Sequence, residues 1–152
     1  PKELADQHLV AEYREIFHIG SHLQRSMASP NWQNCLQTIP ERFCLNKGHV
    51  KFFYNKGEYL HKRYLGLVAE MVGRGMKPDP DRRFKREQWP NELYNDWTPE
   101  EQDLEVVRQR IQQRISLKPD WYRWTKTIKK QVLETRLGKR QKGNQPSRGW
   151  ER

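Results

Sequence analysis

One carboxylate near the start of the chain has neighbours that could assist proton transfer. Glu15 directly follows Arg14, and at helical spacing it shares one polar side with His8, His18 and His22. A carboxylate positioned in this way can serve as a general acid or base. A solvated helix face with ordinary contacts between successive turns would give the same pattern. The stripe alone therefore leaves both interpretations open.

The same stripe also allows a metal hypothesis. Glu15, His18 and His22 would place three ligands on one side of a helix. Helical carboxylate centres use a similar Glu-x-x-His step, but they need further carboxylates from other helices. A metal-dependent nuclease is therefore kept only as a less favoured alternative.

A second cluster, between residues 118 and 124, combines aromatic and basic side chains. Trp121 and Tyr122 are followed by Arg123, and Arg110 and Arg114 precede them by a few residues, one helical turn apart. Aromatic faces stack on unpaired bases, and arginine pairs with phosphate. This composition suits distorted or single-stranded DNA. Aromatic rings that simply cap the core remain the alternative.

The charge of the chain also favours a polyanionic partner. The 152 residues carry a formal net charge of +10, and residues 126–152 contain nine Lys or Arg but only two Glu. Nucleic acid is the commonest partner of such a chain, although a merely solubilising charge is possible. Two cysteines suggest neither a disulfide scaffold nor a zinc site, which indicates a reducing intracellular compartment. No apolar run is long enough to span a membrane.

The hydrophobic periodicity predicts three main helices in one compact all-α domain with long connecting loops. These helices cover about residues 2–24, 55–75 and 98–118. Their expected apolar stripes are Leu9, Tyr13, Ile16, Phe17 and Leu23; Leu60, Tyr64, Leu67, Val68 and Met71; and Leu104, Val107, Ile111 and Ile115. Such stripes must face one another to form a core.

Capping signals and turn residues mark the boundaries of these helices. Asn55 with Glu58 predicts the start of the second helix, Thr98 predicts the start of the third, and Gly75 predicts a stop. Residues 27–48 look irregular, and 50–54 fit either a short extended piece or a lead-in to the next helix. A basic helix is expected to about residue 137. We expect a domain over 1–125 and a partly disordered basic C-terminal extension over 126–152.

Taken together, these segments resemble the phage endonuclease V-type pyrimidine-dimer DNA glycosylases. The resemblance covers roughly residues 2–124, in order and at nearly the spacing of that family. It is carried by Glu-Leu-Ala-Asp-Gln-His-Leu at 3–9, Ala-Glu-Tyr-Arg-Glu at 11–15, Gly-His-Val at 48–50, Phe-Phe-Tyr at 52–54, Lys56, Lys62-Arg63, Arg110, Arg114 and Pro119-x-Trp121-Tyr122.

The resemblance implies a repair enzyme that cleaves the glycosidic bond at a cyclobutane pyrimidine dimer and then nicks the strand by β-elimination through an imine. It implies no cofactor, because the amine is the covalent catalyst. Its partner would be double-stranded DNA with pyrimidine dimers or abasic sites, bound by a monomer in the cytoplasm, at the nucleoid of a bacterial or phage-infected cell. The expected catalytic residues are Glu15 and Arg14, and the expected DNA-binding residues are Gln7, His8, His18, Arg110, Arg114, Trp121, Tyr122 and Arg123.

Two departures from the family pattern concern the nucleophile and one phosphate contact. In that family the nucleophile is the α-amine of an N-terminal Thr, which a short segment separates from the first helix. Pro1 does not match that position. Either the family's first segment precedes Pro1, or Pro1 supplies a secondary amine from a different place. Phe17-His18 stand where the family has Pro-Arg, so an imidazole replaces a guanidinium. A non-catalytic DNA-binding module therefore remains an alternative.

Overall fold

The computed structural model describes residues 1–126, which form helices joined by loops, without a strand in that range. The helices are α1 (Asp6–Met27), α2 (Trp32–Gln37), α3 (His49–Phe52), α4 (Gly57–Gly73) and α5 (Glu101–Leu117), with short 3-10 turns η1 (Arg86–Gln88), η2 (Asn91–Leu93) and η3 (Pro119–Trp121). The all-α prediction is confirmed. The predicted basic helix to about residue 137 and the rest of the extension lie outside the described residues.

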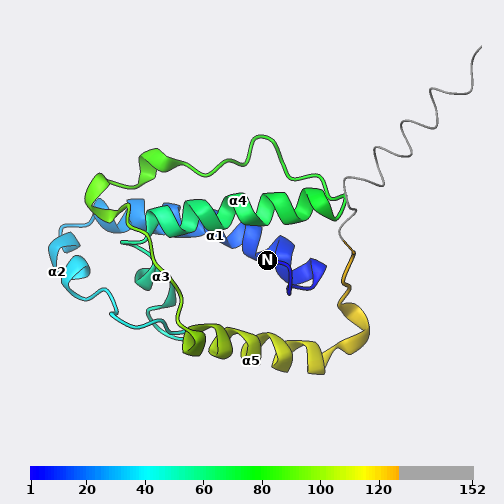
Figure 1. The fold of residues 1–152 in the computed structure, drawn as a ribbon. Coiled ribbons are helices and arrows are strands. Elements are labelled where there is room, and N and C mark those ends of the chain that lie inside the picture. Colours follow the sequence, from blue (N-terminus) through cyan, green and yellow to red (C-terminus); the bar gives the residue numbers. More distant parts are fainter. Residues whose placement is uncertain (127–152) are drawn as a thin grey trace, which may run out of the picture.

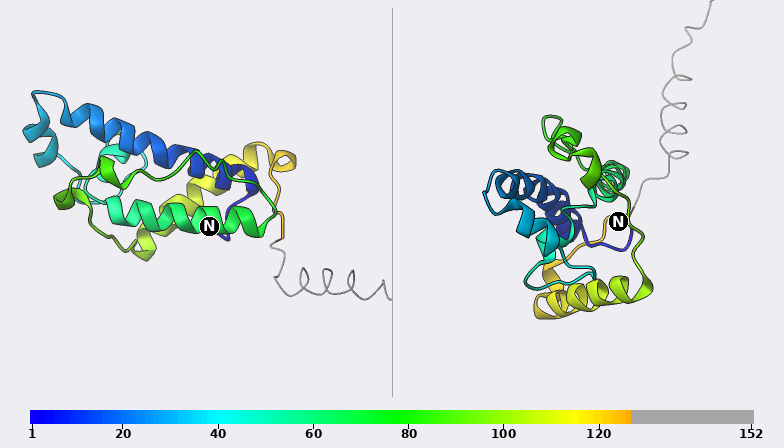
Figure 2. Two further views of the ribbon diagram at one scale, coloured as in Figure 1. Left: turned by 90° about the horizontal axis from the view of Figure 1, so that it is seen from above. Right: turned by 90° about the vertical axis from the view of Figure 1, so that its left-hand side faces the viewer.

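The two long helices α1 and α4 lie side by side, and the rest of the described chain surrounds this pair (Figure 1). The loop from α4 to η1 runs back along one side of the pair, whereas α5 lies on the opposite side (Figure 2). After α5, the chain returns to the beginning of α1, where Asp6 N donates to the carbonyl of Arg123 at 2.7 Å. None of the described helices is long and apolar enough to cross a membrane.

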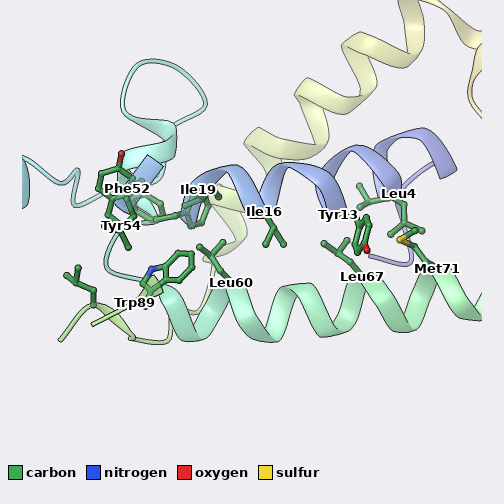
Figure 3. Close-up of a cluster of buried hydrophobic side chains, with 14 residues drawn as sticks. Leu4, Tyr13, Ile16, Ile19, Phe52, Tyr54, Leu60, Leu67, Met71 and Trp89 are labelled. Carbon is green, nitrogen blue, oxygen red and sulfur yellow. The ribbon is translucent and has the colours of Figure 1, made fainter. Parts of the chain in front are cut away.

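The core fills the space between α1 and α4 (Figure 3). Leu9, Leu23, Leu67 and Phe52 are almost completely buried. Burial of such a side chain stabilises the fold by roughly 1.5–3 kcal/mol. The stripes predicted for the first two long helices are confirmed, with Phe17, Tyr64 and Val68 half-buried at their edges.

Trp89 closes one end of this core because two glycines let its ring approach the helices. Its side chain is 2% exposed. A Cβ atom on Gly20 of α1 would lie 3.0 Å from the Trp89 ring, and one on Gly57 of α4 would lie 2.6 Å from it. Phe84 stacks on the same indole, with ring centroids 5.0 Å apart. The loop between α4 and α5 is therefore anchored between the two long helices.

The ends of α1 and α4 differ from the predicted boundaries. α1 begins at Asp6 rather than near Lys2, because residues 1–4 form a turn in which Leu4 N donates to the Pro1 carbonyl at 3.0 Å. The predicted cap by Asn55 is wrong: Lys56 precedes α4, and it donates from Nζ to Asn55 Oδ1 and to the Phe52 carbonyl. The predicted stop is confirmed, since Gly75 has φ +81° and ends α4 with a Schellman pattern of hydrogen bonds.

Further corrections concern α5 and the irregular region. α5 is capped by Glu100, whose side chain exchanges hydrogen bonds with Asp103, and not by Thr98. Its predicted stripe is not buried: Leu104 is exposed, and Val107, Ile111 and Ile115 are only half-buried. Part of the region expected to be irregular folds as α2, and residues 49–52 form helix α3 rather than an extended piece.

A buried guanidinium joins the ends of three segments. The Arg74 side chain, only 2% exposed, contacts Asp6 at 2.8 Å and Glu70 at 2.9 Å. It also donates to the carbonyls of Lys2 and Leu4. Burial alone would lower the pKa of Arg74, but the hydrogen bonds of its two carboxylates raise it overall. The charge is therefore held in place as the anchor of the N-terminal turn.

Substitution of two glycines in α4 should change stability in opposite directions. In Gly57→Ala the new methyl group meets the Trp89 ring, so we expect the free energy of unfolding to fall by about 1–3 kcal/mol. In Gly66→Ala the nearest atom, Cγ of Pro1, lies at an ordinary 3.6 Å, so the better helix propensity should raise it by up to about 1 kcal/mol. Urea denaturation measures both. Equal effects of the two variants would contradict this account of Trp89.

Removal of the Arg74 guanidinium should be among the most damaging single changes. Arg74→Gln takes away the partner of two carboxylates that the fold keeps largely from water, so we expect a loss of about 3–5 kcal/mol in the free energy of unfolding. The exposed Arg83 is a matched control, and Arg83→Gln should stay within about 0.5 kcal/mol of the parent protein. The measurement is again urea denaturation. Similar unfolding midpoints for Arg74→Gln and Arg83→Gln would show that Arg74 does not anchor the N-terminal turn.

Candidate functional site

The exposed face of α1 presents the predicted catalytic pair. Arg14, Glu15 and His18 are exposed, whereas Tyr13 and Ile16 between them are buried. This division follows from the helical period, which places Glu15 and His18 on the side away from the core. Neither Arg14 nor Glu15 makes a hydrogen bond or ion pair with another residue of the range 1–126. Both charges are therefore available to a ligand.

His8 lies in the first turn of α1 and is half-buried. Its ring stacks on Tyr122, with centroids 4.6 Å apart and planes 12° apart. Both imidazole nitrogens are covered, and neither has a hydrogen-bond partner in the structure. Burial lowers the pKa of His8, and the positive charge of Arg114 lowers it further. The fold thus favours the neutral form of the ring and leaves its hydrogen-bonding capacity unfilled, which is typical of a site whose partner is a substrate.

Gln7 holds the aromatic cluster against α1. Its amide nitrogen donates to the carbonyl of Trp121, and its amide oxygen accepts from the backbone N–H of Arg123 at 3.0 Å. Asp6 completes the attachment, since its carboxylate accepts from the hydroxyl of Thr125 at 2.7 Å. In this structure the side chain of Gln7 positions the residue 121–125 segment, and its contact with DNA stays a prediction. The indole of Trp121 remains 57% exposed.

The arginines divide into paired and unpaired groups. Arg63 is paired with Glu12, Arg74 with Asp6 and Glu70, and Arg108 with Glu3 and Glu101. The site arginines are exposed on α1, on α5 and after η3, and none forms an ion pair with a described residue: Arg14, Arg110, Arg114 and Arg123. Unpaired exposed guanidinium groups keep their full capacity for phosphate. Of these arginines, Arg114 acts electrostatically on His8 and the backbone of Arg123 binds Gln7, so both lie near the first turns of α1.

The α-amine of Pro1 lies in a different environment, which the sequence did not reveal. Pro1 is half-buried against Gly66 of α4. Burial lowers the pKa of its amine, and the charge of Arg63 adds to this effect, whereas Glu12 opposes it. Arg63 and Glu12 form a two-pronged ion pair across α1 and α4. The residue types indicated these charges, but their pairing depends on how the two helices pack.

The predicted metal ligands do not converge. Within residues 1–126, no three His, Cys, Asp or Glu side chains are close enough to hold an ion. A second Glu-x-x-His step, which the sequence analysis overlooked, occurs at Glu58 and His61. Glu58 pairs with Lys62, and His61 contacts the hydroxyl of Tyr94 at 2.7 Å. Within the described residues, neither Glu-x-x-His step is therefore completed by a third ligand.

The comparison with protein families gives one finding. A family model described as pyrimidine dimer DNA glycosylase matches residues 1–84, more than half of the chain. The match contains α1 to α4 and therefore Gln7, His8, Arg14, Glu15 and His18. α5 and the residue 121–125 segment lie beyond it, so their place in the site depends on their contacts with α1 and not on this match.

The proximity of Arg114 to His8 can be measured directly. We expect the His8 ring to titrate below its ordinary value of about 6.5. Arg114→Gln should raise that pKa, because it removes a positive charge that opposes protonation. Arg110→Gln is the matched control. Because the pKa of His8 is lower in the folded state than in the unfolded state, the free energy of unfolding should fall as the pH drops below about 6.5. Carbon-detected NMR of the imidazole measures the midpoint, and an unchanged midpoint in Arg114→Gln would contradict the geometry.

Proposed function

This chain belongs to the pyrimidine dimer DNA glycosylase family, and from that membership we propose that it removes the 5′ base of a cyclobutane dimer and then nicks the strand by β-elimination. The observation that carries the proposal is Glu15, an exposed carboxylate without a partner among the described residues, within the matched region. Its substrate would be double-stranded DNA that contains dimers or abasic sites. We further propose that the protein acts as a monomer in the cytoplasm, at the nucleoid.

The proposed chemistry requires a carboxylate and a neutral amine. The amine forms a bond to C1′ of the sugar as the C1′–N bond to the base breaks, and the base leaves with the bonding electrons. The sugar ring then opens to an imine, O4′ takes a proton, and loss of a proton from C2′ expels the 3′ phosphate. Glu15 would stabilise positive charge at the sugar and move these protons. Arg14, beside it in sequence, would hold a phosphate.

Two amines could form the imine. The resemblance implies the α-amine of a segment that precedes Pro1, and the alternative is the amine of Pro1 itself. An α-amine, with a pKa of about 7.7–8.0, is neutral more often than a lysine near 10.4. The lowered pKa of the Pro1 amine is compatible with the second alternative. Among the carboxylates that act on the Pro1 amine, Glu12 has the largest electrostatic effect on its pKa.

The DNA contacts follow from the unpaired cations and exposed rings. Arg110, Arg114 and Arg123 would bind phosphates, and Trp121 would stack on a base exposed by the lesion. A damaged pair costs less to open than an intact pair, which favours lesions over normal DNA. The stacked rings of His8 and Tyr122 would lie beside the opened nucleotide.

Glu15→Gln should separate catalysis from binding. The amide keeps the shape of the side chain but cannot carry the proton, so we expect cleavage of dimer-containing duplex to fall by at least about a hundredfold. Borohydride trapping of the covalent complex should fall in parallel, while binding persists. The assay uses the protein with its cellular N-terminus, in the presence of EDTA. Glu87→Gln, at an exposed residue of η1, is the control.

Three outcomes would count against the proposed enzyme in different ways. Binding that shows no preference for dimer DNA, together with no trapped complex in the parent protein, would establish a non-catalytic DNA-binding module. Complete loss of cleavage in EDTA would support the metal-dependent alternative. Full cleavage by Glu15→Gln would leave the reaction intact but remove Glu15 from it.

A further inference from the structure

A cavity lies at the far end of the polar stripe on α1. His22, two turns beyond Glu15, lines a cavity of about 510 Å³ together with the loop at Thr38–Pro40 and with residues 46–51. A smaller cavity of about 240 Å³ adjoins it and shares Thr38 and Lys51 as walls. Lys51 donates from Nζ to the hydroxyl of Thr38 at this shared wall. None of these residues belongs to the expected catalytic or DNA-binding set.

The charged side chains that line the two cavities are all of one type. Lys47 and Lys51 are cationic, and neither lining contains an Asp or Glu. The other polar residues of the linings are the imidazoles of His22 and His49 and the neutral side chains of Thr38, Asn46, Tyr54, Ser26, Ser29, Asn31 and Asn34. Lysine, hydroxyl and amide groups all donate hydrogen bonds. The cavities therefore present donors and positive charge without a competing carboxylate, which is the pattern that an anion needs.

The segment that carries these lysines, namely the loop before α3 and α3 itself, is fixed by the fold. Gly48 has φ +96°, and a Cβ atom there would also lie 3.2 Å from Cγ of Pro40. His49 is bound through Nδ1 to the carbonyl of Cys44 at 2.9 Å. Phe43 packs against both His49 and Phe52, which belongs to the core. Because its backbone is held by packing and hydrogen bonds, the segment presents Lys47 and Lys51 at a defined place.

The cavity lies in line with the proposed catalytic carboxylate. Seven residues separate Glu15 from His22, which corresponds to about 10 Å along the axis and to nearly the same side of α1. A DNA strand advances by about 3.4 Å per nucleotide, so this distance corresponds to about three nucleotides. We propose that Lys47 and Lys51 bind backbone phosphates of the damaged duplex, about three nucleotides from the reacting sugar. This inference rests on the proposed function, because Glu15 marks the position of that sugar.

Contacts of Lys47 and Lys51 with phosphates would raise the affinity for DNA equally for any base sequence and for damaged or undamaged DNA. The logarithm of the binding constant falls linearly with the logarithm of the salt concentration, and each phosphate contact adds about 0.9 to the steepness of that line. One contact therefore raises the affinity close to tenfold when the salt concentration is lowered from 1 M to 0.1 M. Two lysines would therefore account for a factor of roughly 10 to 100 at 0.1 M. They would fix the register of the duplex on α1, while Glu15 and the aromatic cluster act on the lesion.

The test compares two double variants that carry the same net charge. Lys47→Gln/Lys51→Gln removes the lysines of the cavity, and Lys77→Gln/Lys85→Gln removes two exposed lysines of the loop after α4. Binding of each protein to a long undamaged duplex is measured against salt concentration. For the cavity variant we expect a loss of roughly 10- to 100-fold at 0.1 M salt and a slope that is smaller by about two. The control should stay within about threefold of the parent protein.

A second measurement locates the contact along the DNA. Duplexes with one dimer are shortened from either end, so that the DNA stops two or eight nucleotides from the lesion. When the duplex is shortened from one of its two ends, but not from the other, the parent protein should bind it more weakly. The Lys47→Gln/Lys51→Gln variant should show no such loss at either end. The single variant Lys47→Gln, at an exposed position, repeats the test without the Thr38 hydrogen bond being lost.

The possible results separate this inference from the proposed function. Equal affinity of the cavity variant and the parent protein for long duplex, at every salt concentration, would overturn the phosphate site even if dimer DNA is cleaved normally. An equal loss in the control variant would also overturn it, because general charge would then explain the effect. Conversely, a parent protein that never cleaves dimer DNA would refute the proposed reaction, while the salt slopes would still decide whether the cavity binds phosphate.

Discussion

The buried guanidinium of Arg74 is the interaction on which the site most depends. It binds Asp6 and Glu70 and two carbonyls of the N-terminal turn, so one side chain joins the start of α1 to the end of α4. Asp6 in turn accepts hydrogen bonds from Thr125. The chain of contacts therefore reaches the residue 121–125 segment, which carries Tyr122 onto His8. An ion cluster this far from water is tolerated only when nearly every donor and acceptor has a partner.

The charges outside that cluster follow a different rule. Arg63 and Arg108, like Arg74, are neutralised within the described part of the fold, whereas Arg14, Arg110, Arg114 and Arg123 form no ion pair there. Paired charges contribute to one folded structure, and unpaired charges create a positive potential that attracts a polyanion. The same residue type therefore has two functions, and only tertiary contacts distinguish them. This separation supports the proposed DNA-binding face without any contribution from residues after 126.

The sequence was sufficient for the features that depend on periodicity. α1 and α4 have strong apolar stripes, and their buried faces were predicted from spacing alone. The sequence was insufficient where burial, helix capping or a side-chain partner depends on contacts with other parts of the fold. The stripe of α5 is spaced correctly, but of its four residues only Ile111 packs against the core, and Leu104 stays exposed. Glu100, a weak capping residue by type, caps α5 because Asp103 reciprocates. Likewise, the contacts of Gln7 within the fold could not be predicted from the sequence, because they are made with the backbone of a segment that lies far away in the chain.

The shallow attachment of α5 has a consequence for how the protein opens and closes. Since α5 contains no buried residue, it can separate from the rest of the fold at a small cost in free energy, and its amide protons should exchange with solvent before those of α1 or α4. Arg110 and Arg114 are carried by this weakly held helix. A polyanion that binds them favours the docked form over the separated one, so its binding energy is spent partly on ordering α5. The affinity of the site and the local stability of this helix are thus thermodynamically coupled.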